Sequence, residues 1–195
     1  MRARRIARPA AALTLLLLAG GFTPLAAPSG DEPRYTRTVE RYEVPDVTLI
    51  DQEARAVRAR EVLAGPGPVI LDFIYGTCTT ICPVLSAGFA SLQRRLGEEA
   101  GQVRFVSISI DPEHDTPEVT KAYLERYRAR PGWDFLTGSR EDADSMMRAF
   151  DAYVPNKMQH FPVTFLRQRD GSWVRIYGLI GTAELLAEFR RVTAP

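Results

Sequence analysis

A nearly continuous apolar run over residues 69–75 is the strongest pattern in the chain. Its β-branched and aromatic side chains indicate a strand that is covered on both faces, as at the centre of a parallel sheet. Pro83 then suits the first turn of a helix, where its missing N–H group has no helical partner to lose. Apolar residues recur at helical spacing after it, at Leu85, Phe89, Leu92 and Leu96. The pattern predicts a central strand followed at once by a helix.

Strand-like and helix-like patterns alternate along the rest of the chain. Residues 44–50 and 57–63 predict an N-terminal β-hairpin. The later predicted elements are strands over 103–110 and 134–137, a hairpin of 163–167 and 173–177, and helices that begin at Thr116 or cover 141–150 and 182–192. This order predicts an α/β protein with a thioredoxin-like fold, in which helices flank a central mixed β-sheet. We expect one such domain over residues 42–195.

The first residues have the pattern of an export signal. Four arginines precede an uncharged, Ala- and Leu-rich stretch over residues 10–22, which is typical of a secretory signal peptide. The stretch is shorter than the roughly 20 apolar residues that a membrane-spanning helix needs. We predict a signal peptide over residues 1–27, with an uncleaved N-terminal membrane anchor as the alternative. Both place the protein outside the cytoplasm, in a bacterial periplasm or on the outer face of the cytoplasmic membrane.

The charge and composition of the chain limit the classes of partner that it can bind. The chain has 25 basic and 24 acidic residues, and removal of residues 1–27 would leave 21 basic residues against 24 acidic ones, a net charge of about −3. Nucleic-acid binding needs a concentrated basic face, so we expect no nucleic-acid partner. Residues 28–41 are charged, contain proline and lack apolar periodicity, which predicts a flexible tether.

Cys78 and Cys82, the two cysteines of the chain, lie between the predicted central strand and its helix. A helix N-terminus presents free N–H groups and a partial positive charge, which favour thiolate over thiol. One helical turn brings positions i and i+4 to one face, so the two sulfurs can close a disulfide or bind one ion. Exported thiols tend to pair or to hold metal, and a soft sulfur donor set selects Cu(I) or Zn.

Two thiolates leave a metal site open, and the chain has two histidines that could complete it. His114 lies in a polar loop between a strand and a helix, where an exposed side chain without a function is expected. His160 directly precedes the apolar strand that starts at Val163, and in a thioredoxin-like sheet that strand start faces the cysteine turn. Spacing alone leaves His160 equally open to a structural role, and the dithiol favours a ligand role.

Three blocks of sequence stand in order along the chain: residues 73–83 with both cysteines, residues 106–112 with 115–117, and residues 132–138. Together they resemble the Sco/SenC family, the copper-binding assembly factors of cytochrome c oxidase. The resemblance extends from about residue 44 to 189. It implies that Cys78, Cys82 and His160 bind one copper ion, as Cu(I) or Cu(II), for delivery to the CuA-type centre of a cytochrome c oxidase subunit.

The segment around His160 departs from the common family pattern. Many members have an aspartate where this chain has Gln159, and no proline where it has Pro162. Pro162 either is a cis-proline of the thioredoxin type that faces the cysteines, which would favour thiol exchange, or marks a bacterial branch that retains the histidine. We favour the second interpretation.

The other residues that could donate to a metal are explained by packing or by turn formation. Met158 is a soft donor near His160, but an isolated methionine more often serves packing. Met146 and Met147 lie on a predicted helix and are expected in the core. Asp111 and Asp115 resemble family acids near the site, and as Asp-Pro and pre-helix residues they can equally shape the turn.

Two functions fit the predicted site. The first is an exported copper chaperone that hands copper to an apo copper protein by stepwise ligand exchange. The alternative is a thiol-disulfide oxidoreductase that keeps the recipient's cysteines reduced and draws on a thiol reductant partner; whether the protein is an enzyme depends on this choice. A thiol peroxidase is disfavoured, because Leu71 and Tyr75 stand where the peroxiredoxin pattern has Pro and Thr. A purely structural disulfide is disfavoured too, since so short a loop removes little chain entropy.

Overall fold

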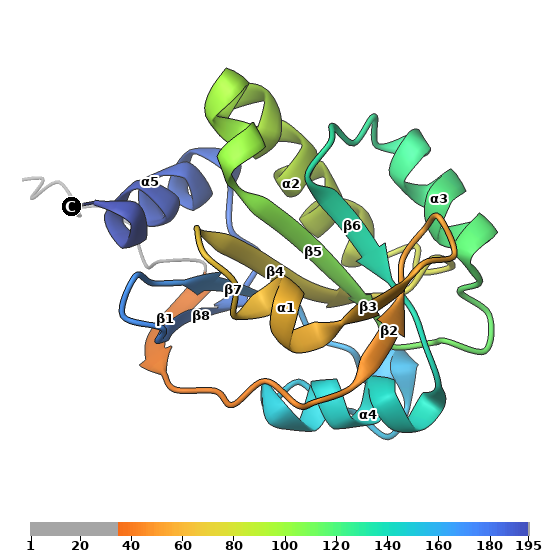
Figure 1. The fold of residues 1–195 in the computed structure, drawn as a ribbon. Helices are drawn as coiled ribbons and strands as arrows, with labels where there is room; N and C mark the ends of the chain where they lie inside the picture. Colours follow the sequence, from red (N-terminus) through yellow and green to blue (C-terminus); the bar gives the residue numbers. More distant parts are fainter. Residues whose placement is uncertain (1–34, 195) are drawn as a thin grey trace, which may run out of the picture. The chain divides into compact units, whose positions relative to one another are not determined.

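The structure is a computed structural model that describes residues 35–194. Its main strands are β1 (Tyr35–Glu40), β4 (Val69–Ile74), β5 (Arg104–Ser109), β6 (Trp133–Leu136), β7 (Val163–Arg167) and β8 (Trp173–Gly178). They form one six-stranded sheet in the order β1-β8-β7-β4-β5-β6 (Figure 1). β4, β5 and β6 are parallel, whereas β7, β8 and β1 join antiparallel. The predicted mixed sheet is confirmed, with the apolar run of β4 at its centre.

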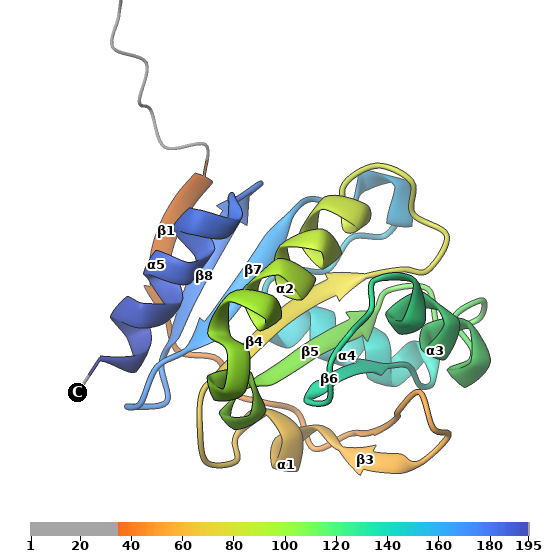
Figure 2. The ribbon, with the colours of Figure 1, turned by 90° about the horizontal axis from the view of Figure 1, so that it is seen from above.

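Helices cover both faces of this sheet, as Figure 2 shows. The main ones are α2 (Cys82–Leu96), α3 (Pro117–Arg126), α4 (Arg140–Ala149) and α5 (Thr182–Thr193). α2 packs on one face, where the Phe89 ring lies 5.7 Å from that of Phe105 in β5 and 5.5 Å from that of Trp133 in β6. Phe150, which follows α4, packs against Phe73 of β4 on the opposite face. All four helices were predicted to within a few residues.

The starts of two helices follow the expected chemistry. Thr116 precedes α3 and its side chain accepts a hydrogen bond from the Val119 amide, while Pro117 occupies the first turn. Ser139 caps α4 in the same way by accepting from the Asp142 amide. Each cap satisfies one of the amides that a helix N-terminus leaves without a partner.

The predicted N-terminal hairpin is shorter than expected. β2 (Thr48–Ile50) and β3 (Ala56–Arg58) pair antiparallel as a separate two-stranded sheet. The expected return strand over 57–63 is wrong beyond residue 58, because α1 (Ala59–Leu63) occupies that segment. Ala59, Val62 and Leu63 are buried there, and their i, i+3, i+4 spacing suits one face of a helix.

Part of the predicted tether is also wrong. Residues 35–40 form β1, which pairs with β8 over its whole length. This edge strand buries little of its side-chain surface, so the sequence shows no apolar alternation. Its backbone hydrogen bonds to β8 and the ion pair of Arg37 with the buried Glu188 hold it in place. The predicted signal peptide or anchor over 1–27 lies outside the described residues. Within residues 35–194, no helix has the length and apolarity to cross a membrane.

Candidate metal and thiol site

The two cysteines lie on the turn that joins β4 to α2. The amide of Cys78 donates to the Tyr75 carbonyl at 3.2 Å, and the amide of Cys82 donates to the Cys78 sulfur at 3.4 Å. Cys82 is the first residue of α2 and Pro83 follows it in the first turn. Both cysteines are reduced and buried. The turn therefore aims a helix N-terminus at the Cys78 sulfur, as the sequence predicted.

The two thiols differ in acidity. Burial raises the pKa of Cys78, but hydrogen bonds from Cys82 and Thr80 outweigh it, so that the pKa falls below the usual value. For Cys82, burial and the hydrogen bond with Cys78 raise the pKa well above that value. Cys78 is therefore the thiol that ionises first, and its thiolate is the better nucleophile and the first available metal donor.

An acidic loop over residues 110–116 contacts this turn from the end of β5. Asp115 is fully buried, accepts a hydrogen bond from the Gly76 amide at 3.0 Å and one from the Ser109 hydroxyl at 2.5 Å. A Cβ atom at Gly76 would lie only 2.8 Å from the Asp115 carboxylate. Asp115 thus fixes the backbone two residues before Cys78. Of the two interpretations of this acid, a place near the site and a role in the turn of its own loop, the structure supports the first.

His160 lies beside the end of β4, as the sequence predicted. Thr164 of β7 pairs with Asp72 of β4 in antiparallel register, which brings the residues before β7 next to the residues after β4. The His160 ring packs 6.4 Å from the Tyr75 ring and 6.2 Å from the Phe161 ring. The described residues contain no cis peptide bond, so Pro162 is trans and the cis-proline alternative is wrong.

The His160 imidazole lacks polar partners. Both of its ring nitrogens are buried, and neither has a hydrogen-bond partner of good geometry among the described residues. Burial lowers the pKa of His160 to about 4, with the Phe73 backbone opposing the shift. The ring is therefore neutral at neutral pH, the form in which histidine binds metals.

The three predicted ligands are brought to one end of the sheet, but not into a finished cluster. Within residues 35–194, no three side chains of His, Cys, Asp or Glu lie close enough together to hold a metal ion as they stand. Their chemistry nevertheless suits copper, because two sulfurs and a neutral imidazole are soft to borderline donors. The orphaned nitrogens of His160 add to this fit, since a metal bond would satisfy one of them.

The structure also shows the exposure and contacts of the other residues that the sequence offered as metal donors. His114 is exposed, and its Nδ1 atom lies 3.1 Å from the Asp111 carboxylate. Met158 is 75% exposed, and its sulfur accepts a hydrogen bond from the Tyr75 hydroxyl at 3.8 Å. Met146 and Met147 are buried, which confirms their assignment to the core.

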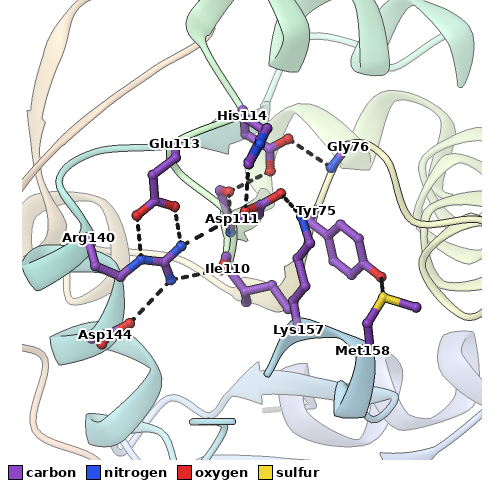
Figure 3. Close-up of polar contacts among 12 residues, drawn as sticks. Tyr75, Gly76, Ile110, Asp111, Glu113, His114, Arg140, Asp144, Lys157 and Met158 are labelled. Carbon is purple, nitrogen blue, oxygen red and sulfur yellow. Dashed lines mark hydrogen bonds and ion pairs between the residues drawn. The ribbon is translucent and has the colours of Figure 1, made fainter. Parts of the chain in front are cut away.

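Three charged residues near the site were not predicted from the sequence. Lys157 and Arg140 both face Asp111 from other elements, as Figure 3 shows. Neither stands in a pattern that marks it, because the contact joins segments far apart in the chain. Asp72 could have been found, since it is a lone acid inside the apolar run of β4. It is fully buried, and neither carboxyl oxygen has a hydrogen-bond partner of good geometry among the described residues.

A mixed sheet with a reduced cysteine pair between its central strand and the following helix defines a thioredoxin-like protein with a dithiol turn. The family model SCO1/SenC matches residues 36–193. The chain therefore belongs to the SCO1/SenC family.

Known relatives agree with this assignment. The SCO1 protein homolog of Bacillus subtilis (strain 168) is 37% identical over 117 residues, which cover 58% of this chain and 59% of that relative, less than two thirds of its length. The structure of Bradyrhizobium japonicum ScoI with copper bound aligns with a TM-score of 0.64 and 27% identity, covering 76% of this chain and 98% of the other. BsSco, described as a Sco-family cytochrome c oxidase assembly protein with a disulfide switch, aligns with a TM-score of 0.65 and 28% identity, covering 78% and 94%.

Proposed function

We propose that this protein binds one copper ion through Cys78, Cys82 and His160 and delivers it to the CuA-type centre of a cytochrome c oxidase. The observation that carries the proposal is that both ring nitrogens of His160 are buried without a hydrogen-bond partner among the described residues, beside the end of β4, the strand that precedes the dithiol turn. The copper-bound ScoI relative supports the choice of metal. The description of BsSco as a cytochrome c oxidase assembly protein supports the choice of recipient.

The unpartnered imidazole also gives an energetic argument. A buried polar group without a hydrogen bond costs about 1–3 kcal/mol, and a metal–nitrogen bond would offset that cost. At neutral pH the ring has no proton to lose before it binds, because its pKa is about 4. Histidine is thus ready to bind, whereas each thiol must first lose a proton.

The difference in pKa between the two thiols suits a stepwise transfer of copper. Cys78 has the lowered pKa and supplies the first thiolate, while Cys82 has a raised pKa and loses its proton only as the ion binds. On release the order reverses, so that Cys82 regains a proton first. A recipient with its own thiolates can then take the ion from Cys78 by ligand exchange.

Replacement of His160 by alanine tests the ligand assignment. The reduced full-length chain should bind one copper ion anaerobically, and His160→Ala should weaken binding at least tenfold, about 1.4 kcal/mol. His114→Ala is the matched control, because it removes the chain's other histidine, whose side chain is 66% exposed. Equal affinity of His160→Ala and the parent would show that His160 is not a ligand.

A thiol-disulfide oxidoreductase is the second candidate, and the difference in acidity between the thiols favours it. The Cys78 thiolate would attack a recipient's disulfide and form a mixed disulfide, releasing one recipient thiolate, which takes up a proton. Cys82 would then lose its proton and attack the Cys78 sulfur, which closes the Cys78–Cys82 disulfide and frees the second recipient thiol. A separate thiol reductant must restore the dithiol. Reduction of a disulfide peptide by both the parent and His160→Ala would support this activity.

Export is part of the proposal. Its basis is the arginine-rich start and apolar stretch within residues 1–27. We expect the protein in the periplasm or on the outer face of the cytoplasmic membrane. Cell fractionation with N-terminal sequencing of the purified protein would distinguish a cleaved signal from a retained anchor, and recovery from the cytoplasm would contradict both.

A further inference from the structure

Lys157 belongs to residues 156–160, the histidine segment, and links this segment to the ends of β4 and β5. It opens η2 (Lys157–Gln159), a 3₁₀ turn that directly precedes His160. Its ammonium group lies 2.5 Å from the Asp111 carboxylate and 5.4 Å from the centre of the Tyr75 ring. Figure 3 shows the side chain between these two partners. One residue of the histidine segment thus contacts both the acidic loop after β5 and the residue after β4.

Asp111 is a firmly held partner for this lysine. Its side chain is only 6% exposed, and its amide donates to the Ser109 hydroxyl at 3.0 Å. Arg140 lies farther away, at 3.9 Å, and its guanidinium is shared with Glu113, Asp144 and the Ile110 carbonyl. Lys157 is therefore the cation nearest to Asp111, and removing it would leave a nearly buried carboxylate without its main counter-ion.

Apart from the packing of the His160 ring against Tyr75, few contacts hold the histidine segment. None of the three residues of η2 is buried. Within the segment, the Gln159 amide donates to the Asn156 carbonyl at 2.8 Å and the His160 amide donates to the Lys157 carbonyl at 3.1 Å. Outside it, Met158 accepts the hydrogen bond from Tyr75, which is a weak one because sulfur is a poor acceptor. Among the described residues, this ion pair is the charged contact that connects the turn to the cysteine end of the sheet.

We propose that Lys157 is a positioning residue for His160, which through its ion pair with Asp111 holds the imidazole beside the dithiol. The inference rests on the proposed function, since it gives the ion pair control over a copper ligand. Groups that orient a metal ligand without touching the metal typically change affinity by about 10- to 100-fold. The lysine should therefore act on copper binding while remaining outside the donor set.

The test compares three variants of the full-length chain. Lys157→Gln removes the charge, Lys157→Arg keeps it, and Lys121→Gln removes a lysine whose ion pair with Glu53 lies on the surface. Hydrogen exchange of the Gln159 and His160 amides is measured without copper. Copper affinity is then measured by anaerobic titration, and histidine ligation by nitrogen hyperfine structure in the electron paramagnetic resonance of the Cu(II) form.

We expect Lys157→Gln to speed exchange of both amides at least tenfold, to weaken copper binding by about 10- to 100-fold and to lose the nitrogen hyperfine signal. Lys157→Arg and Lys121→Gln should match the parent in all three. Unchanged exchange in Lys157→Gln overturns the positioning role, as does unchanged copper affinity in a chain that binds copper. If the parent binds no copper but exchange still rises, the proposed copper function fails and the positioning role stands.

Discussion

The cysteine turn and the histidine segment approach the same end of the sheet, but they are built in different ways. The turn is continuous with β4 and α2, and backbone amides hold it: the Cys82 amide donates to the Cys78 sulfur and the Cys78 amide donates to the Tyr75 carbonyl. The histidine segment is a short exposed 3₁₀ turn, and the ring that follows it has no polar partner among the described residues. The thiol half of the site is thus built mainly from one continuous stretch of chain, supported by the Asp115–Gly76 contact, while the imidazole half depends on long-range contacts.

This difference has a functional meaning. A rigid dithiol can exchange electrons or hold an ion whether or not the histidine is in place, whereas the histidine can add affinity only when its segment is held. Changes in the turn should therefore damage both proposed functions. Changes in the histidine segment should damage copper binding alone.

The largest effect is expected from the cysteines. Cys78→Ser and Cys82→Ser should each abolish disulfide exchange, since neither single thiol can complete the cycle, and should weaken copper binding at least a hundredfold, about 2.7 kcal/mol. Parallel assays of peptide-disulfide reduction and copper titration measure this, with His160→Ala as the contrasting variant. If Cys82→Ser keeps parental copper affinity, Cys82 is not a copper ligand and the thiol half does not dominate copper binding.

The next effect is expected at Asp72 of β4, and it concerns stability alone and depends on pH. Burial raises the pKa of Asp72 to about 7 from an ordinary 3.8, although the Ser107 hydroxyl opposes it. The folded protein therefore retains this proton where the unfolded chain loses it, so the fold has its full stability at low pH and loses part of it as the pH rises from 3.8 to about 7. The loss amounts to about 4 kcal/mol.

Asp72→Asn cannot ionise and should remove this pH dependence. Relative to the parent, its free energy of unfolding should rise by about 4 kcal/mol between pH 4 and 8, measured by urea denaturation at several pH values. Asp46→Asn is the control, because it removes a carboxylate whose side chain is 55% exposed. A constant difference between Asp72→Asn and the parent across that range would mean that Asp72 titrates alike in the folded and unfolded states.

The smallest effect is expected at Gly76, where the cysteine turn meets the acidic loop. An alanine Cβ there would lie 2.8 Å from the Asp115 carboxylate and 3.1 Å from the Val119 side chain. Gly76→Ala should lower the free energy of unfolding by about 1–3 kcal/mol through overpacking. Gly101→Ala is the matched control, because its Cβ would have no heavy atom within 4 Å. Equal stability of the two variants would show that the turn adapts more easily than the contact implies.

Local patterns in the sequence were enough to predict the central strand, the helix after it and the turn that carries the cysteines. The apolar run of β4, the helical spacing after Pro83 and the turn between them placed the two cysteines correctly, because each depends on residues a few positions apart. The edge strand β1 could not be found in this way, since its residues are mostly exposed and its stability comes from pairing with β8, more than 130 positions away along the chain.

Tertiary structure alone decided which long-range contacts hold the two halves of the site. The sequence indicated that His160 precedes a strand facing the cysteines, but not that Lys157 meets Asp111 across 46 positions or that Asp115 reaches Gly76 across 39. Short-range periodicity reports which face of an element is buried. It carries no information on which charged side chains meet when separate strand ends converge, because that depends on the register and twist of the assembled sheet.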